Sequence, residues 1–167
     1  QLLQNNLAGL DQSQDTKHAE AICKSSIIGS GQATAEIAFP EQAPIPATSK
    51  IIAFNGGVKG GVTTFYIHAY LTVPTPAAIV STVKIKKIHK GRYGIGSVTT
   101  IPKIAGGSGS LTSFNFKIHR TFNYRGKKHS YLLARCANGR FFAHAATAFA
   151  DGSRAEGTVV RTCSARR

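Results

Sequence analysis

Residues 64–73, Thr-Phe-Tyr-Ile-His-Ala-Tyr-Leu-Thr-Val, alternate between apolar and more polar side chains, and this stretch decides the fold class. Phe65, Ile67 and Leu71 fall on one side of an extended chain, and the tyrosines and the histidine fall on the other. A period of two is typical of a half-buried β-strand. Prolines at positions 74 and 76 mark the next corner, because proline cannot donate a hydrogen bond within a sheet.

Strand-like segments of similar length continue from this stretch in both directions along the chain. The expected strands cover 32–39, 48–54, 64–73, 79–88, 93–101 and 114–122, a segment ending at Cys136, 141–149 and 157–163. Turn sequences such as Asn123–Gly126 and Asp151–Gly152 separate them. Since no helices are available for parallel crossovers, the sequence predicts a mainly β protein, an antiparallel β-sandwich or a barrel-like sandwich with one short N-terminal helix.

The N-terminal residues differ in character from the rest. Asp15 and Thr16 can cap a helix, and Ala19, Ile22 and Cys23 follow with the spacing of one helical face. We expect residues 1–30 to form an extension whose short helix covers one end of the sheets. Residues 31–167, after Gly-Ser-Gly, are expected to form a single antiparallel β domain.

The alternating pattern also predicts the core. Six apolar side chains are expected to be buried, each costing about 2–5 kcal/mol on replacement by Ala. They are Phe65, Ile67, Leu71, Phe114, Phe116 and Ile118.

Charge is distributed unevenly along the 167 residues. There are 21 Lys and Arg residues against 7 Asp and Glu, a formal net charge of +14, and no acid lies between Gln42 and Ala150. This excludes most carboxylate chemistry from the middle of the chain. A paired-carboxylate glycosidase would have to use Glu36, Glu41, Asp151 and Glu156, whose turn and surface positions have simpler explanations.

No motif for a nucleophile, a metal or a cofactor is present. The chain lacks the G-x-S-x-G elbow, a phosphate loop followed by a helix, and paired His or Cys ligands at metal-binding spacing. We therefore expect no catalytic residue, no cofactor and no metal. Folding could still bring His68, His119 and His144 together, which keeps an enzyme of an unfamiliar His-based type as an alternative.

The three cysteines give an odd count. Cys136 and Cys163 flank a predicted hairpin and are expected to form a disulfide, which leaves Cys23 over. Closing that loop would contribute about 3–4 kcal/mol in the chain-entropy model. The alternative is three reduced thiols.

Basic residues gather in three segments and predict a surface that attracts polyanions. They are Lys84, Lys86, Lys87, Lys90, Arg92, Lys117, Arg120, Arg125, Lys127 and Lys128. Tyr66, His68 and Tyr70 form a polar strand face that could add stacking planes. The expected partner is an anionic cell-envelope polymer or a lipid surface. Neither sequence-specific nucleic-acid binding nor a membrane span is predicted.

Several turn-rich segments resemble a group of exported actinobacterial β-rich proteins with no assigned activity. They are Ile-Ile-Gly-Ser-Gly-Gln-Ala-Thr-Ala (27–35), Ala-Phe-Asn-Gly-Gly (53–57), Ile-Pro-Lys-Ile-Ala-Gly-Gly-Ser-Gly (101–109), Tyr-Arg-Gly-Lys-Lys-His-Ser-Tyr-Leu (124–132) and Phe-Ala-Asp-Gly (149–152), with the terminal Cys163. The resemblance covers residues 16–167 with gaps. It implies export and a further cysteine before Cys23, which residues 1–22 lack, so the pairing of Cys23 stays open.

Together these features predict a secreted, non-catalytic β-protein that serves as an extracellular or cell-envelope structural or binding module. A removed signal peptide would explain why the chain does not begin with Met, and a chain boundary would explain it equally well. One alternative is a self-associating filament or envelope subunit built through unpaired sheet edges. Another is an electrostatic binder of polyanions, which could be an envelope polymer, a lipid surface or nucleic acid.

Overall fold

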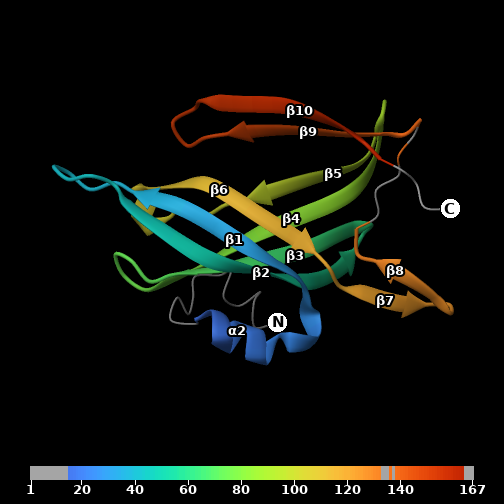
Figure 1. The fold of residues 1–167 in the computed structure, drawn as a ribbon, viewed down its shortest axis with the longest axis horizontal. Coiled ribbons are helices and arrows are strands. Elements are labelled where there is room, and N and C mark those ends of the chain that lie inside the picture. The colour runs from blue at the N-terminus through green and yellow to red at the C-terminus, as the bar shows by residue number, and fades with distance from the viewer. Residues whose placement is uncertain (1–14, 133–135, 137, 164–167) are drawn as a thin grey trace. The chain divides into compact units, whose positions relative to one another are not determined.

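The computed structural model describes residues 15–132, 136 and 138–163, and the protein is mainly β. In chain order the elements are α2 (Thr16–Ile22), η1 (Lys24–Ser26), β1 (Ile27–Ile37), β2 (Ile45–Lys59), β3 (Val62–Leu71), β4 (Ala77–Lys90), β5 (Tyr93–Thr100), η2 (Ala105–Gly107), β6 (Gly109–Ile118), β7 (Thr121–Tyr124), β8 (Lys127–Ser130), β9 (Arg140–Ala148) and β10 (Arg154–Thr162). A curled six-stranded sheet has the order β5-β4-β3-β2-β1-β6 (Figure 1), and β7–β8 and β9–β10 form two-stranded sheets. The predicted antiparallel fold with a short N-terminal helix is confirmed.

The described chain divides into two compact units. The first holds residues 15–86 and 97–131, which include most of the large sheet, α2 and the β7–β8 hairpin. The second holds 87–96, which is the tip of the β4–β5 hairpin, and the described residues from 132 onward, which include β9 and β10. The expectation of a single β domain over 31–167 stays a prediction.

Helix α2 begins where the sequence predicts it. The Asp15 carboxylate accepts a hydrogen bond from the backbone N–H of His18 at 2.8 Å, which satisfies a free amide of the first turn. Ala19 is buried against Ile52 and Phe54 of β2, so the helix covers one face of the sheet (Figure 1). Residues 1–14 of the expected extension lie outside the described residues.

The first strand starts four residues earlier than the expected boundary at residue 31. The Gly29-Ser30-Gly31 segment lies inside β1 and pairs with both β2 and β6. A Cβ atom on Gly31 would collide with the carbonyl oxygen of Asn115 in β6, and one on Gly29 would collide with that of Lys117. These glycines therefore allow β1 and β6 to approach closely. The Gly-Ser-Gly segment has the composition of a flexible turn, but it lies inside a strand.

Two of the predicted core residues are fully buried and one is exposed. Phe65 and Leu71 are buried as predicted. Ile67, Phe116 and Ile118 are half-buried and pack against the cluster formed by Ile28, Ala53 and Phe65. The prediction for Phe114 is wrong, since its side chain is 61% exposed. Phe114 lies in β6, an edge strand of the sheet, whereas the buried clusters centre on the inner strands.

The predicted stacking face of β3 is not available to a ligand. Tyr66 is buried in the cluster that Ala19, Ile52 and Phe54 form beneath α2, and His68 is also buried. Only Tyr70 of the three predicted residues is half-exposed. The short helix covers the strand face that the alternation alone assigned to solvent.

Candidate functional site

The β7–β8 hairpin is an exposed segment of the first unit that carries both aromatic and basic residues. Its two strands pair from Thr121 opposite Ser130 to Tyr124 opposite Lys127. Arg125 and Gly126 form the two-residue turn, with φ of 51° and 73°, which is the left-handed geometry of a type I′ hairpin. Every residue from 121 to 128 is exposed.

Arg120 fixes the base of this hairpin to the sheet. Strand β6 ends at Ile118, and the backbone N–H groups of His119 and Arg120 both donate to the carbonyl oxygen of Ile28, each at 3.1 Å. The Arg120 guanidinium donates to the carbonyl oxygens of Ser25 at 2.7 Å and Ile27 at 2.9 Å. The expected continuous strand over 114–122 is therefore divided in two, and one predicted polyanion-binding residue has a structural role.

Four aromatic rings form a row along one face of the hairpin, which we call the aromatic row: Tyr131, Phe122, His129 and Tyr124. Phe122 lies 5.0 Å from Tyr131 and 5.7 Å from His129 between ring centroids, and Tyr124 lies 6.1 Å from His129. Tyr131 packs against the buried cluster of the sheet. The row thus connects the core of the first unit to the hairpin tip.

Three cations lie at the same end of the hairpin as Tyr124. The Arg125 guanidinium carbon lies 5.3 Å from the centroid of the Tyr124 ring, a cation–π contact. Lys127 and Lys128 follow directly after the turn and are exposed. Within the part of the chain that the structure describes, the one ion pair joins Lys50 to Glu20 at 2.7 Å. The positive charge at the tip is therefore not neutralised by a neighbouring carboxylate.

The other predicted basic residues belong to the large sheet or to the second unit. Lys84, Lys86 and Lys117 are exposed on the large sheet. Three strands separate β4 from β6 in the sheet order, so Lys117 lies about 19 Å from the β4 lysines at the usual strand spacing. Lys87 and Arg92 belong to the second unit. The side chain of Lys90 lies outside the described part.

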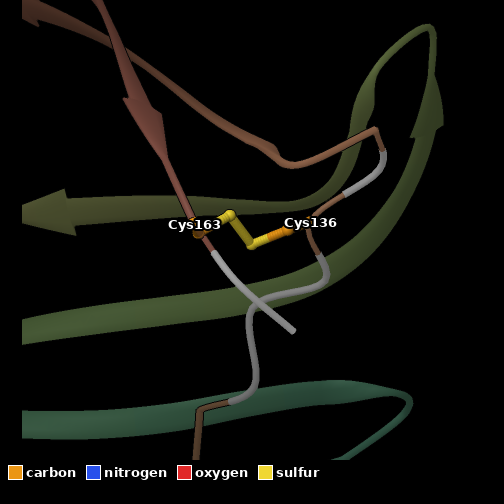
Figure 2. The surroundings of a disulfide bond; sticks show 2 residues. All are labelled: Cys136 and Cys163. Atoms are coloured by element: carbon orange, nitrogen blue, oxygen red, sulfur yellow. A yellow bond between two sulfur atoms is a disulfide. The ribbon is translucent and has the colours of Figure 1, made fainter. Parts of the chain in front are cut away.

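A disulfide closes the β9–β10 hairpin in the second unit, as predicted. Cys136 precedes β9 and Cys163 follows β10, with their Cα atoms 6.4 Å apart (Figure 2). The backbone N–H of Cys163 donates to the carbonyl oxygen of Gly139 at 3.0 Å. Cys23 is free and half-buried in the first unit.

The remaining candidates for chemistry are the three histidines considered above. His68 is buried in β3, His119 is exposed after β6, and His144 belongs to the second unit, where its Nδ1 lies 3.0 Å from Thr158 Oγ1. No group of three or more His, Cys, Asp or Glu residues that could hold a metal occurs in the described residues. The three-histidine enzyme therefore gains no support.

Asp151, one of the four carboxylates considered above, has a local partner. Its carboxylate accepts hydrogen bonds from the Ser153 hydroxyl at 2.6 Å and from the Ser153 N–H at 2.8 Å. These two bonds lower the pKa of Asp151 below its ordinary value. Its environment is that of a turn residue at the end of a hairpin.

A hollow of about 290 Å³ lies at one end of the first unit. Ile37 and Leu71 contribute to its wall, together with the corner at 73–76 and Lys103. It is at the lower limit of small-molecule pockets in size, and Lys103 is the one charged residue in its lining. The aromatic row with its cations offers more recognition chemistry.

Sequence reasoning located the basic turn but missed the aromatic row. The register of the β7–β8 hairpin could have revealed this row. A two-residue turn at Arg125-Gly126 places Phe122 opposite His129 and puts Tyr124 on the same face. Assigning Phe122 to the preceding strand concealed this arrangement.

No helix in the described residues is long and apolar enough to cross a membrane. The resemblance to exported actinobacterial proteins remains a prediction from the quoted segments. No family model, no curated protein and no solved structure matches this chain.

Proposed function

We propose that this protein is a non-catalytic binding module of the extracellular or cell-envelope space that attaches to anionic polymers or surfaces. The observation that carries the proposal is the exposed, uncompensated positive charge of Arg125, Lys127 and Lys128 at the β7–β8 tip. Uncompensated cations raise the local potential and attract polyanions over a wide range of orientations.

The three tip cations act together because they are close. At most about 11 Å of chain separates the Cα atoms of Arg125 and Lys128, since three Cα–Cα steps of 3.8 Å join them. This is comparable to the Debye length of about 8–10 Å at physiological ionic strength, so salt screens their fields from one another only in part.

The disulfide and the resemblance to exported proteins support the extracellular or cell-envelope location. Disulfides persist in oxidising environments, and the Cys136–Cys163 bridge closes an otherwise exposed hairpin. The segments quoted above resemble exported proteins. The absence of carboxylates from residues 43–149 and the open surface of the hairpin favour binding over catalysis, since catalytic groups work best where water is excluded.

Binding of the full chain to dextran sulfate and to uncharged dextran of the same length tests this function. At about 50 mM salt we expect binding to the sulfated polymer and none to the neutral one, because the attraction is electrostatic. Equal binding to both polymers, or binding to neither, would contradict the proposal.

Self-association is a second candidate function, favoured by the β9–β10 hairpin. Among the described residues this sheet has two strands, and within them only Phe142 is not exposed. Open edges of this kind can pair with a second chain. Light scattering after size exclusion over a hundredfold concentration range decides it: growing assemblies support the subunit function, and a constant monomer mass removes it.

A further inference from the structure

We propose that the β7–β8 hairpin is an interfacial anchor whose tip enters the headgroup region of an anionic lipid bilayer. The inference rests on the proposed function and names its partner. The observation behind it is that the tip joins exposed aromatic rings to exposed cations. An anionic bilayer interface offers both an apolar layer and negative charge.

The exposed rings distinguish a bilayer from a dissolved polyanion. Phe122 is 40% exposed and Tyr124 is 56% exposed, although the sheet beside them buries other aromatic side chains. A flexible anionic polymer in water provides little apolar surface to cover these rings. Tyrosine, like tryptophan, is favoured at the membrane–water interface, where the ring is shielded and the hydroxyl stays hydrated.

The cations complement the charge of the lipid headgroups. Arg125, Lys127 and Lys128 lie at the same end of the hairpin as Tyr124, and no acid occurs between Gln42 and Ala150. Each Lys or Arg near an anionic membrane strengthens binding about fivefold. Three of them therefore give about a hundredfold, to which burial of the rings adds.

The dimensions of the hairpin suit insertion of its tip. Strand β7 has four residues and extends about 14 Å at the usual rise. The interfacial layer of one leaflet is about 5–8 Å thick, half the difference between the whole bilayer and its hydrocarbon core. The tip can enter this layer while Arg120 and Tyr131, at the base, stay fixed to the first unit.

Arg125 lies at a turn position whose backbone conformation is unfavourable for arginine. Arg125 has φ of 51°, a conformation that favours glycine or asparagine and costs other residues roughly 1–2 kcal/mol. An arginine in this position is unfavourable for the turn, and residues held in unfavourable backbone conformations cluster at functional sites. Its position puts a cation at the outermost point of the hairpin, which agrees with a role in binding.

A fluorescent reporter tests insertion directly, because the chain contains no tryptophan. Tyr124→Trp places an indole at the tip, and Phe114→Trp places one at another exposed aromatic position of the same unit. With vesicles of phosphatidylglycerol and phosphatidylcholine, we expect a blue shift for Tyr124→Trp alone. With pure phosphatidylcholine vesicles we expect no shift in either variant.

Matched charge variants test the role of the tip. Replacing Arg125, Lys127 and Lys128 together by Ala should weaken binding to the anionic vesicles about a hundredfold. The control replaces three exposed sheet lysines by Ala and changes the net charge by the same amount. It should weaken binding less than about fivefold, because those charges lie outside the contact and are screened. These lysines are Lys84, Lys86 and Lys117. Equal losses in the two variants would overturn the anchor.

Arg125→Asn separates binding from folding. Asparagine tolerates the left-handed turn, so the melting temperature should stay constant or rise while vesicle affinity falls about fivefold. Unchanged affinity would contradict a role for the guanidinium.

The outcomes also separate this inference from the proposed function. Binding to dextran sulfate without vesicle binding, or vesicle binding without a blue shift for Tyr124→Trp, overturns the anchor and leaves polyanion binding in place. Failure to bind either probe overturns both. Vesicle binding with the shift, lost in the tip variant, supports both.

Discussion

The large sheet and the β9–β10 hairpin have the same secondary structure and different sources of stability. The sheet buries Ile28, Ile52 and Phe54 completely. Within the hairpin strands, Phe142 alone is half-buried, and the Arg92 guanidinium carbon lies 4.7 Å above its ring. The sheet is stabilised mainly by apolar burial, whereas the hairpin depends on a covalent bridge and a small contact with the β4–β5 tip.

This difference shows what a β-strand pattern does and does not determine. An isolated two-stranded hairpin is marginally stable in water, and three or more strands with a buried face are stable on their own. The Cys136–Cys163 bridge compensates for the small apolar burial of the β9–β10 hairpin, because it restricts the unfolded chain. The two regions should therefore respond to different perturbations.

The largest effect is expected in the sheet core. Phe65→Ala should lower the free energy of unfolding by about 3–5 kcal/mol, because it empties a buried cluster. The matched control Phe114→Ala removes the same ring from a position that is 61% exposed, and its effect should stay within about 0.5 kcal/mol. Urea unfolding measures both values. Similar losses would mean that β6 is covered in solution.

Reduction of the disulfide should act on the second unit. We expect a loss of about 3–4 kcal/mol in the local stability of residues 136–163, from the chain-entropy model. Native-state hydrogen exchange with and without reductant measures it, and amides in β2 and β3 serve as the internal control. Recovery of Cys136 and Cys163 both alkylated in non-reducing peptide mapping would contradict the bridge itself.

An intermediate effect is expected at the base of the β7–β8 hairpin. Arg120→Met keeps the side-chain length and removes the donors to Ser25 and Ile27, which should cost about 1.5–3 kcal/mol. Arg154→Met, at an exposed position in β10, is the matched control and should be nearly neutral. Thermal unfolding compares the two, and equal melting temperatures would remove the structural role of Arg120.

The smallest effect concerns pH and the turn at Asp151. Its pKa is lowered by the Ser153 hydrogen bonds, so the folded state favours the ionised carboxylate. The resulting stabilisation is fully present above the ordinary pKa of 3.8 and is lost as pH falls through the lower folded value. The stability difference between the protein and Asp151→Ala should therefore exist at about pH 6 and shrink at about pH 2. A stability difference that is the same at both pH values would show that ionisation of Asp151 does not contribute to it.

The alternation of side chains predicted most of the strands, because a period of two is a local property of the sequence. It did not predict which strand face a helix covers, and Tyr66 was assigned to solvent for that reason. It also did not show that Phe114 lies on an edge strand. Gly29 and Gly31 have the composition of a turn, and only the neighbouring β6 backbone explains their place inside a strand.

The candidate site was predictable in part for the same reason. The cysteine pair and the basic turn at Arg125 depend on local sequence, and both appear in the structure. The aromatic row depends on register across the turn, which the assignment of Phe122 to the wrong strand obscured. The buried environment of Tyr66 depends on α2, far away in the sequence.

The ionic-strength dependence of binding tests the central claim, that this scaffold acts through its uncompensated cations. The measurement is the association constant of the full chain for dextran sulfate as salt rises from about 50 to 200 mM. We predict a linear fall of log K with log salt amounting to at least about tenfold, because each contact with a polyanion releases counterions. An affinity that stays constant over this range would contradict the account.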